Sequence, residues 1–280
     1  MSILEQLKLY FSYDFVRFAF IAGVLISLCA GLLGVVLVLR RYAMIGDGLS
    51  HVAFGAMAVA AVLGLAPMAV ALPVTVAVAV LLLLAGEKRL IKGDAAIAML
   101  SAGSLAVGYL LLNLFPASDT GSLSGDVCAS LFGSTSMLTL SQGDVLLCLG
   151  LSLAVIAFFT LFYRRIFAVT FDEAFATSAG IRTRVYHFLI AAVSGVVIVL
   201  SMKLVGALLI SSLVIFPALS SMRLFRSFRA VVIASAVFSV VGSLVGIVAS
   251  LLLSTPTGAS IAATHLLLFA LCSLVGRARR

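Results

Sequence analysis

The sequence predicts an all-α protein, a polytopic bundle of about nine transmembrane helices, and two observations support this prediction. Of the 280 residues, 64% are hydrophobic and only 10% are charged, and the mean hydropathy is +1.31. Soluble domains carry about a quarter charged residues, so this composition excludes a soluble globular enzyme. The apolar residues also form runs of the length that a bilayer requires, about 20 residues for each helix. We therefore expect one transmembrane domain over residues 1–280.

The apolar runs define the expected helices in chain order. They cover residues 15–39, 42–64, 67–86, 95–115, 143–163, 186–202, 204–222, 229–253 and 258–276. Only Ser201, Met202 and Lys203 separate the sixth run from the seventh. Fusing these two runs gives an alternative with eight spans, in which every later connection changes sides.

The distribution of basic residues decides between eight and nine spans. With the N-terminus outside, nine spans place most Lys and Arg residues on the inner side, as the positive-inside rule requires. These inner residues are Arg40, Arg41, Lys88, Arg89, Lys92, Arg164, Arg165, Arg182, Arg184, Arg223, Arg226, Arg229, Arg277, Arg279 and Arg280. Eight spans would put the later clusters outside. We therefore predict nine spans with the C-terminus inside, and the net charge of +8 reflects topology rather than nucleic-acid binding.

Two connections are long, an outer one near 116–142 and an inner one near 164–185. The inner connection contains FDEAFATSAGI, which has the pattern of a short amphipathic helix. Asp172 and Glu173 suit its first turn, and Gly180 suits its end. The side chains expected on its apolar face are Phe171, Phe175 and Ala179. The spacing leaves two interpretations open, a linker resting on lipid headgroups and a docking element for a soluble partner.

Ionisable residues inside a bilayer are costly, so each is a candidate functional residue. Asp47 is the only carboxylate well inside an expected span, and His51 follows one helical turn later. Both side chains can reach one divalent cation, because carboxylate and imidazole groups suit zinc or manganese. The alternative is an Asp–His pair that only locks two helices. His265, in the last expected span, is either a further ligand or a structural residue at a helix interface.

Small residues recur every four positions in the first and eighth expected spans. Such faces allow two helix backbones to approach closely, so they predict a tightly packed bundle. The residues are Gly23, Ser27 and Gly31 in the first span and Gly242, Gly246 and Ser250 in the eighth.

Several catalytic motifs are missing from the sequence. No lysine follows a glycine, so the chain has no P-loop for ATP hydrolysis. No HExxH motif is present, and one buried aspartate is too few for an intramembrane aspartyl protease. The sequence therefore predicts a protein that is not an enzyme.

Four segments, in this order, resemble a known family over nearly the whole chain. They are RRYAMIGDGLSHVAFG, LFGSTSMLTLSQGD, FDEAFATSAGI and VGALLISSLVIFPALSS. The chain is similar to the permease subunits of the ABC transporters that import zinc, manganese or iron. The resemblance implies a fold like that of the vitamin B12 and siderophore importers, in the inner membrane of a prokaryote. It also implies a homodimer or a heterodimer with a paralogue, two separate ATPase subunits, and an extracytoplasmic metal-binding protein.

The resemblance also implies roles for single residues. The segment from Phe171 to Ile181 becomes the coupling helix that docks on the ATPase, with Asp172, Glu173, Ala176 and Gly180 matching the family. Asp47 and His51 match an Asp-x-x-x-His pattern of the metal pathway, whereas His265 matches no family position. The metal is the transported cargo, zinc, manganese or iron, and no cofactor is expected. The rival hypothesis is a secondary metal transporter driven by protons, with Asp47 as the proton carrier.

Overall fold

The computed structural model describes residue 5 and residues 9–84, 93–115 and 140–278, and this part contains helices and no strands. The main helices are α2 (Asp14–Leu39), α3 (Ile45–Val62), α4 (Pro67–Leu84), α5 (Gly93–Leu114), α7 (Gln142–Leu161), α8 (Tyr163–Phe171), α9 (Glu173–Ser178), α10 (Thr183–Val205), α11 (Ala207–Leu224), α12 (Phe228–Leu253) and α13 (Thr257–Ala278). Most of the expected outer connection, residues 116–139, and the basic residues at 88, 89, 92, 279 and 280 lie outside the described residues.

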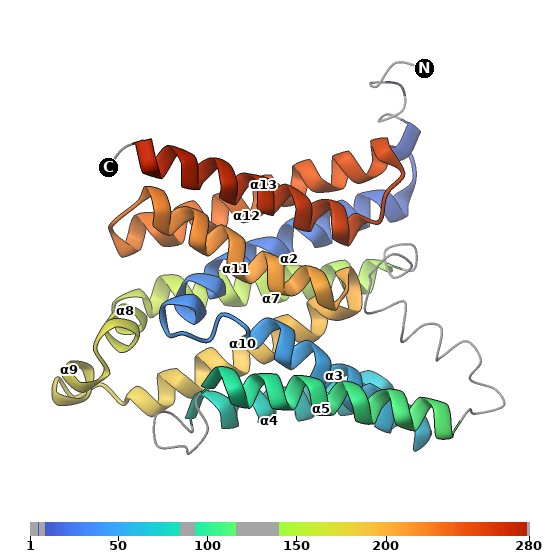
Figure 1. Ribbon diagram of the computed structural model, residues 1–280, viewed down its shortest axis with the longest axis horizontal. Coiled ribbons are helices and arrows are strands. Elements are labelled where there is room, and N and C mark those ends of the chain that lie inside the picture. Colours follow the sequence, from blue (N-terminus) through green and yellow to red (C-terminus); the bar gives the residue numbers. More distant parts are fainter. Residues whose placement is uncertain (1–4, 6–8, 85–92, 116–139, 279–280) are drawn as a thin grey trace.

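The structure confirms the helical bundle and refines one boundary. Eight of the described helices are long and apolar enough to cross a membrane, and the seventh expected span corresponds to the shorter apolar helix Leu209–Leu224. In Figure 1, α11 runs back along the bundle between α10 and α12, so α10 and α11 point in opposite directions. The break before α11 lies at Gly206, not at the expected Lys203. Gly206 has φ +96° and ψ 156°, a conformation available almost only to glycine.

Helix α2 lies in the centre of the bundle, between α12 and α11 on one side and α7 and α10 on the other (Figure 1). Its predicted face of small residues is used in this packing. The Ser239 hydroxyl of α12 donates to the Ser27 carbonyl at 2.6 Å, and the Ser235 hydroxyl donates to the Gly31 carbonyl at 2.7 Å. A Cβ atom at Gly31 would lie 2.7 Å from the Ser239 Cβ. The small face of α2 therefore meets serines of α12.

The second small-residue face, on α12, packs against a different neighbour. A Cβ atom at Gly246 would overlap the backbone of Ile261 in α13, and one at Gly242 would lie 2.7 Å from the His265 ring. The two predicted faces thus do not pack against each other. Each gives a separate helix pair, α2–α12 and α12–α13, room for close approach.

The helices at the edges of the bundle expose apolar side chains outward. Leu110 of α5, Leu147 of α7 and Leu267 of α13 are exposed examples, and each of these three helices buries less than a third of its apolar window. A water-soluble protein would bury such surfaces. Lipid tails or a second transmembrane subunit can cover them.

The described basic clusters gather at one end of the bundle. Figure 1 places α8 and α9 at the end where α13 finishes, opposite the end where α2 begins. Arg40 at the end of α2 pairs with Glu173 of α9, and the Arg223 carbonyl oxygen lies against Gly276 near the end of α13. The first contact joins the end of α2 to α9, and the second brings the end of α11 to the end of α13, all on the side that the sequence predicts to face inward.

Candidate functional site

Asp47 and His51 lie in the first two turns of α3, on the same helical face. The Asp47 Oδ2 atom is 3.9 Å from the His51 Nδ1 atom, and the two side chains are 30% and 21% exposed. Both groups are thus neither enclosed in the core nor fully solvated. One carboxylate and one imidazole, both partly exposed on the same helical face, can bind a cation that reaches them.

The turn between α2 and α3 fixes where this pair starts. The Tyr42 N–H donates to the Leu37 carbonyl at 2.9 Å, and the Ile45 N–H donates to the Tyr42 carbonyl at 3.1 Å. Arg41 between them has φ +63°, a left-handed conformation that glycine usually occupies at the end of a helix. The end of α2 and the start of α3 are therefore linked by a short, hydrogen-bonded turn.

Helix α5 supplies a partner for His51 that the sequence did not reveal. The His51 Nδ1 atom lies 2.6 Å from the Ser101 hydroxyl. This approach is possible because Gly48 brings α3 close to Ile97, where a Cβ atom would overlap the isoleucine side chain. A bond to Nδ1 orients the imidazole ring and leaves Nε2 as the nitrogen available to a ligand. In the sequence, Ser101 is marked only as a serine within an apolar run. Such serines are common in membrane helices, so this one did not stand out.

Asp47 and His51 supply two ligands, and the described residues add no third one nearby. Within the part of the chain that the structure describes, no group of three or more His, Cys, Asp or Glu side chains could hold a metal ion. His265 therefore does not join Asp47 and His51. It is fully buried in α13, its ring lies over Gly242 of α12, and its Nδ1 atom is 2.8 Å from the Ile261 carbonyl oxygen. This environment fits a structural residue at a helix interface.

The inner connection contains the short helix α9, but its boundaries differ from the sequence prediction. Phe171 ends α8, and Asp172 has extended backbone angles, φ −147° and ψ 93°. The Asp172 carboxylate caps α9 by accepting a hydrogen bond from the Phe175 N–H at 2.8 Å. Gly180 has φ +80° just after the helix. The predicted apolar face of Phe171, Phe175 and Ala179 is therefore wrong, because Phe171 belongs to the preceding helix.

Different residues hold α9 on the bundle. Ala176 is buried against Val169 and Tyr186. Phe171 instead packs its ring on Phe167 and on Phe228 of α12. Phe175 points away from this packing and is 65% exposed. The arrangement leaves the large apolar side chain of Phe175 exposed on α9.

Glu173, at the start of α9, contacts the bundle through an arginine and a histidine side chain. Its Oε2 atom is 3.5 Å from Arg40 Nη2 and 3.6 Å from His187 Nε2. Burial lowers the pKa of the Arg40 guanidinium, and the Glu173 carboxylate opposes this shift. Arginine still keeps its proton at physiological pH.

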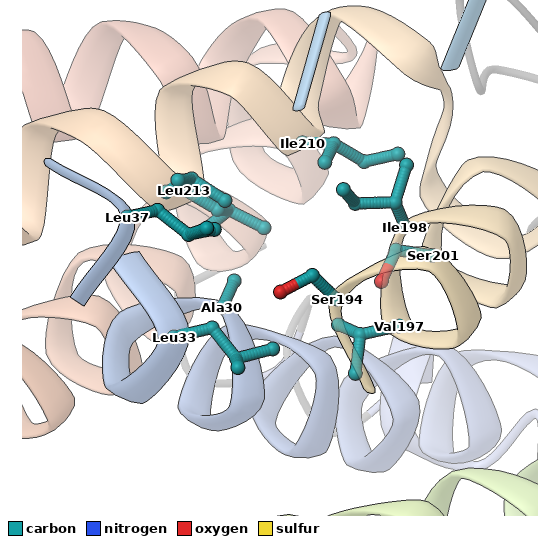
Figure 2. Close-up of a pocket in the computed structure, with 10 residues that line it drawn as sticks. Ala30, Leu33, Leu37, Ser194, Val197, Ile198, Ser201, Ile210 and Leu213 are labelled. Carbon is teal, nitrogen blue, oxygen red and sulfur yellow. The ribbon is translucent and has the colours of Figure 1, made fainter. Parts of the chain in front are cut away.

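A small cavity lies deeper in the bundle, between α2, α10 and α11 (Figure 2). Its lining is apolar apart from Ser194 and Ser201, whose buried hydroxyls have no hydrogen-bond partner in the described structure. The free space is about that of one water molecule. It contains no carboxylate or imidazole group, so it is not a metal site.

Comparisons with known proteins cover nearly the whole chain. The sequence model of the ABC 3 transport family matches residues 12–276. The chain is 28% identical over 260 residues to the manganese transport system membrane protein MntC of Halalkalibacterium halodurans, covering 93% of this chain and 87% of that protein. It is 30% identical over 270 residues to a probable metal transport system membrane protein of Treponema pallidum, covering 95% of this chain and 98% of that protein.

A solved structure shares the fold. PsaBC from Streptococcus pneumoniae, in complex with Fab, superposes with a TM-score of 0.82 at 25% sequence identity. The match covers 96% of this chain and 95% of the other. The same arrangement of helices is thus present in both proteins from end to end.

Proposed function

The chain belongs to the ABC 3 transport family, and from this premise we propose that it is the membrane permease of an ATP-driven importer of divalent metal ions. The observation that carries the proposal is the Asp47–His51 pair on α3, in a chain whose relatives are named for manganese or metal transport. The name of the Halalkalibacterium halodurans relative favours manganese as the cargo. Carboxylate and imidazole ligands accept zinc and iron as well.

Asp47 and His51 would bind the metal on its way through the membrane. The carboxylate attracts the dication, and the Ser101 contact holds the imidazole ring in place. Two protein ligands bind weakly enough for release, which conduction requires. A homodimer, or a heterodimer with a paralogue, would place a second such pair near the first if α3 faced the partner.

Helix α9 would couple this pathway to ATP hydrolysis in a separate subunit. The support is its position at the arginine-rich end, its length of six residues, and the exposed Phe175. An ATPase on the inner side would contact α9, and an extracytoplasmic metal-binding protein would deliver the ion at the opposite end. This assignment places the start of α2 outside and the end of α13 inside, in the cytoplasmic membrane of a prokaryote.

Metal uptake into proteoliposomes tests the proposal. The vesicles carry this chain with a partner ATPase, the metal-binding protein is added outside, and ATP is enclosed on the ATPase side. Uptake of Mn²⁺, Zn²⁺ and Fe²⁺ is then measured. We expect Asp47→Asn and His51→Ala to lower uptake about tenfold or more, since second-shell changes alone cost this much at metal sites. ATPase assembly should be unchanged.

Asp14→Asn is the matched control, because Asp14 is an exposed carboxylate that pairs with Arg17 at the other end of α2. It should transport at the wild-type rate. Wild-type uptake in the Asp47 and His51 variants, with a lower unfolding temperature, would show that the pair only locks helices. Uptake that needs a proton gradient and no ATP would favour the secondary transporter instead.

A further inference from the structure

Arg40 lies at the junction between the proposed metal pathway and the proposed coupling helix. Its side chain is only 12% exposed, although it stands at the end of a transmembrane helix where solvent or headgroups could receive it. The neighbouring Arg41 is exposed. A basic residue that merely marks the inner side of the membrane has no need to be buried, because burial costs hydration energy. The partial burial of the Arg40 side chain is therefore best explained by a specific partner.

That partner is Glu173, which is 133 residues away in the sequence. Arg40 Nη2 and Glu173 Oε2 are 3.5 Å apart, and the Nε2 atom of the buried His187 lies 3.6 Å from the same oxygen. The backbone of α9 packs on α8 and α10. The Glu173 side chain extends from this position to the end of α2, so it bridges α9 to a helix outside its own packing.

The turn after Arg40 connects this bridge to the metal pair. Arg40 is followed by the short hydrogen-bonded turn through Tyr42 to Ile45, where α3 begins. Asp47 lies in the first turn of that helix. Because the turn is closed by backbone hydrogen bonds and contains the left-handed Arg41, it has little freedom to absorb a movement. A displacement of Arg40 therefore shifts the start of α3.

We propose that Arg40 is a positioning residue that transmits the movement of α9, through its ion pair with Glu173, to the helix carrying Asp47 and His51. The inference rests on the proposed function, since it assumes that α9 responds to an ATPase. It assigns Glu173 to a contact within this chain rather than to the ATPase surface. The exposed Phe175 remains the α9 side chain that faces the partner.

A double-mutant cycle tests the bridge in the complete complex. Arg40→Gln, Glu173→Gln and the double variant are reconstituted with the ATPase and the Mn²⁺-loaded binding protein, and Mn²⁺ uptake is measured per ATP hydrolysed. We expect each single variant to lower this ratio about tenfold, a common size for coupling between linked sites. The double variant should lose no more than either single one, because both remove the same interaction.

Two controls separate positioning from structure. Arg41→Gln removes an adjacent exposed charge from the same left-handed turn and should keep the wild-type ratio. Arg40→Lys keeps the cation and should recover most of the ratio that Arg40→Gln loses, whereas a purely steric role of the guanidinium would not be rescued. If Arg40→Gln fails to reach the membrane, the comparison between Arg40→Lys and Glu173→Gln carries the test.

The outcomes are distinct. A wild-type ratio in Arg40→Gln overturns the inference, and so do additive losses in the double variant, which would mean that Glu173 acts on another partner. Absence of Mn²⁺, Zn²⁺ and Fe²⁺ uptake by the wild-type complex would overturn the proposed function itself. Normal wild-type uptake with an additive cycle overturns only the bridge.

Discussion

Replacing His265 distinguishes a structural role from a part in transport. The side chain is fully buried in α13, and its ring lies directly over Gly242 of α12. His265→Ala removes a ring intermediate in size between leucine and phenylalanine side chains, whose removal from cores costs about 2–5 kcal/mol. We expect a loss of about 3 kcal/mol in the free energy of unfolding, or roughly 6–12 °C in the unfolding midpoint.

The facing glycine provides the second half of the test. A Cβ atom at Gly242 would lie 2.7 Å from His265 Nε2 and 2.9 Å from Cε1, several tenths of an ångström inside ordinary contact. Gly242→Ala should therefore cost about 1–3 kcal/mol, as overpacking does. In the double variant the new methyl group enters the space left by the ring. The combined loss should fall short of the sum by about 1 kcal/mol or more.

The assay is thermal unfolding of the purified chain in detergent, followed by a fluorogenic thiol reagent. The buried Cys29 and Cys272 report the transition, because they react only when the bundle opens. Mn²⁺ uptake per folded molecule is measured in parallel and should stay at the wild-type level in all three variants. A fall of tenfold or more in uptake, with an unchanged midpoint, would refute the structural assignment of His265.

Three further predictions concern the metal pair, the α2–α3 turn and the topology. Ser101→Ala removes the partner of the His51 imidazole and should weaken the apparent affinity for Mn²⁺ about tenfold, with the maximal ATPase rate unchanged, as measured by uptake against Mn²⁺ concentration. Arg41→Gly should raise the free energy of unfolding by about 1 kcal/mol, since glycine adopts φ +63° without strain, and thermal unfolding measures the gain. In a chain without native cysteines, an impermeant thiol reagent should label Thr255→Cys from outside and Ser178→Cys only after permeabilisation. Labelling of both from one side would contradict the nine-pass topology.

Hydropathy predicted the helices well because each span must satisfy its own backbone hydrogen bonds in lipid. The predicted break between α10 and α11 lies too early in the chain, because the charged Lys203 interrupts the apolar run. The chain in fact continues as helix to Val205 and turns at Gly206, where only the backbone conformation, φ +96°, marks the end. A charge near a span end is a weaker signal than a glycine that must adopt a positive φ.

The candidate site was only partly predictable for a different reason. Asp47 and His51 are one turn apart, so helical periodicity alone places them together. The Ser101 hydroxyl comes from 50 residues away and meets His51 only because α3 and α5 pack closely at Gly48. The prediction put Phe171 on the apolar face of α9, because an aromatic residue before Asp172 suits that face as well as the end of α8. Such choices depend on tertiary contacts that spacing does not encode.

The arginines at the end predicted to face inward show how one sequence pattern can hide two roles. The positive-inside rule accounts for Arg40 and Arg41 equally, since it depends only on the side of the membrane. Burial separates them, because an exposed charge satisfies the rule at no desolvation cost, whereas a buried guanidinium requires a nearby carboxylate. Arg41 is exposed, and Arg40 is partly buried beside Glu173. Topology alone requires neither residue to leave the surface, so the partial burial of Arg40 is explained by the contact that it makes with α9.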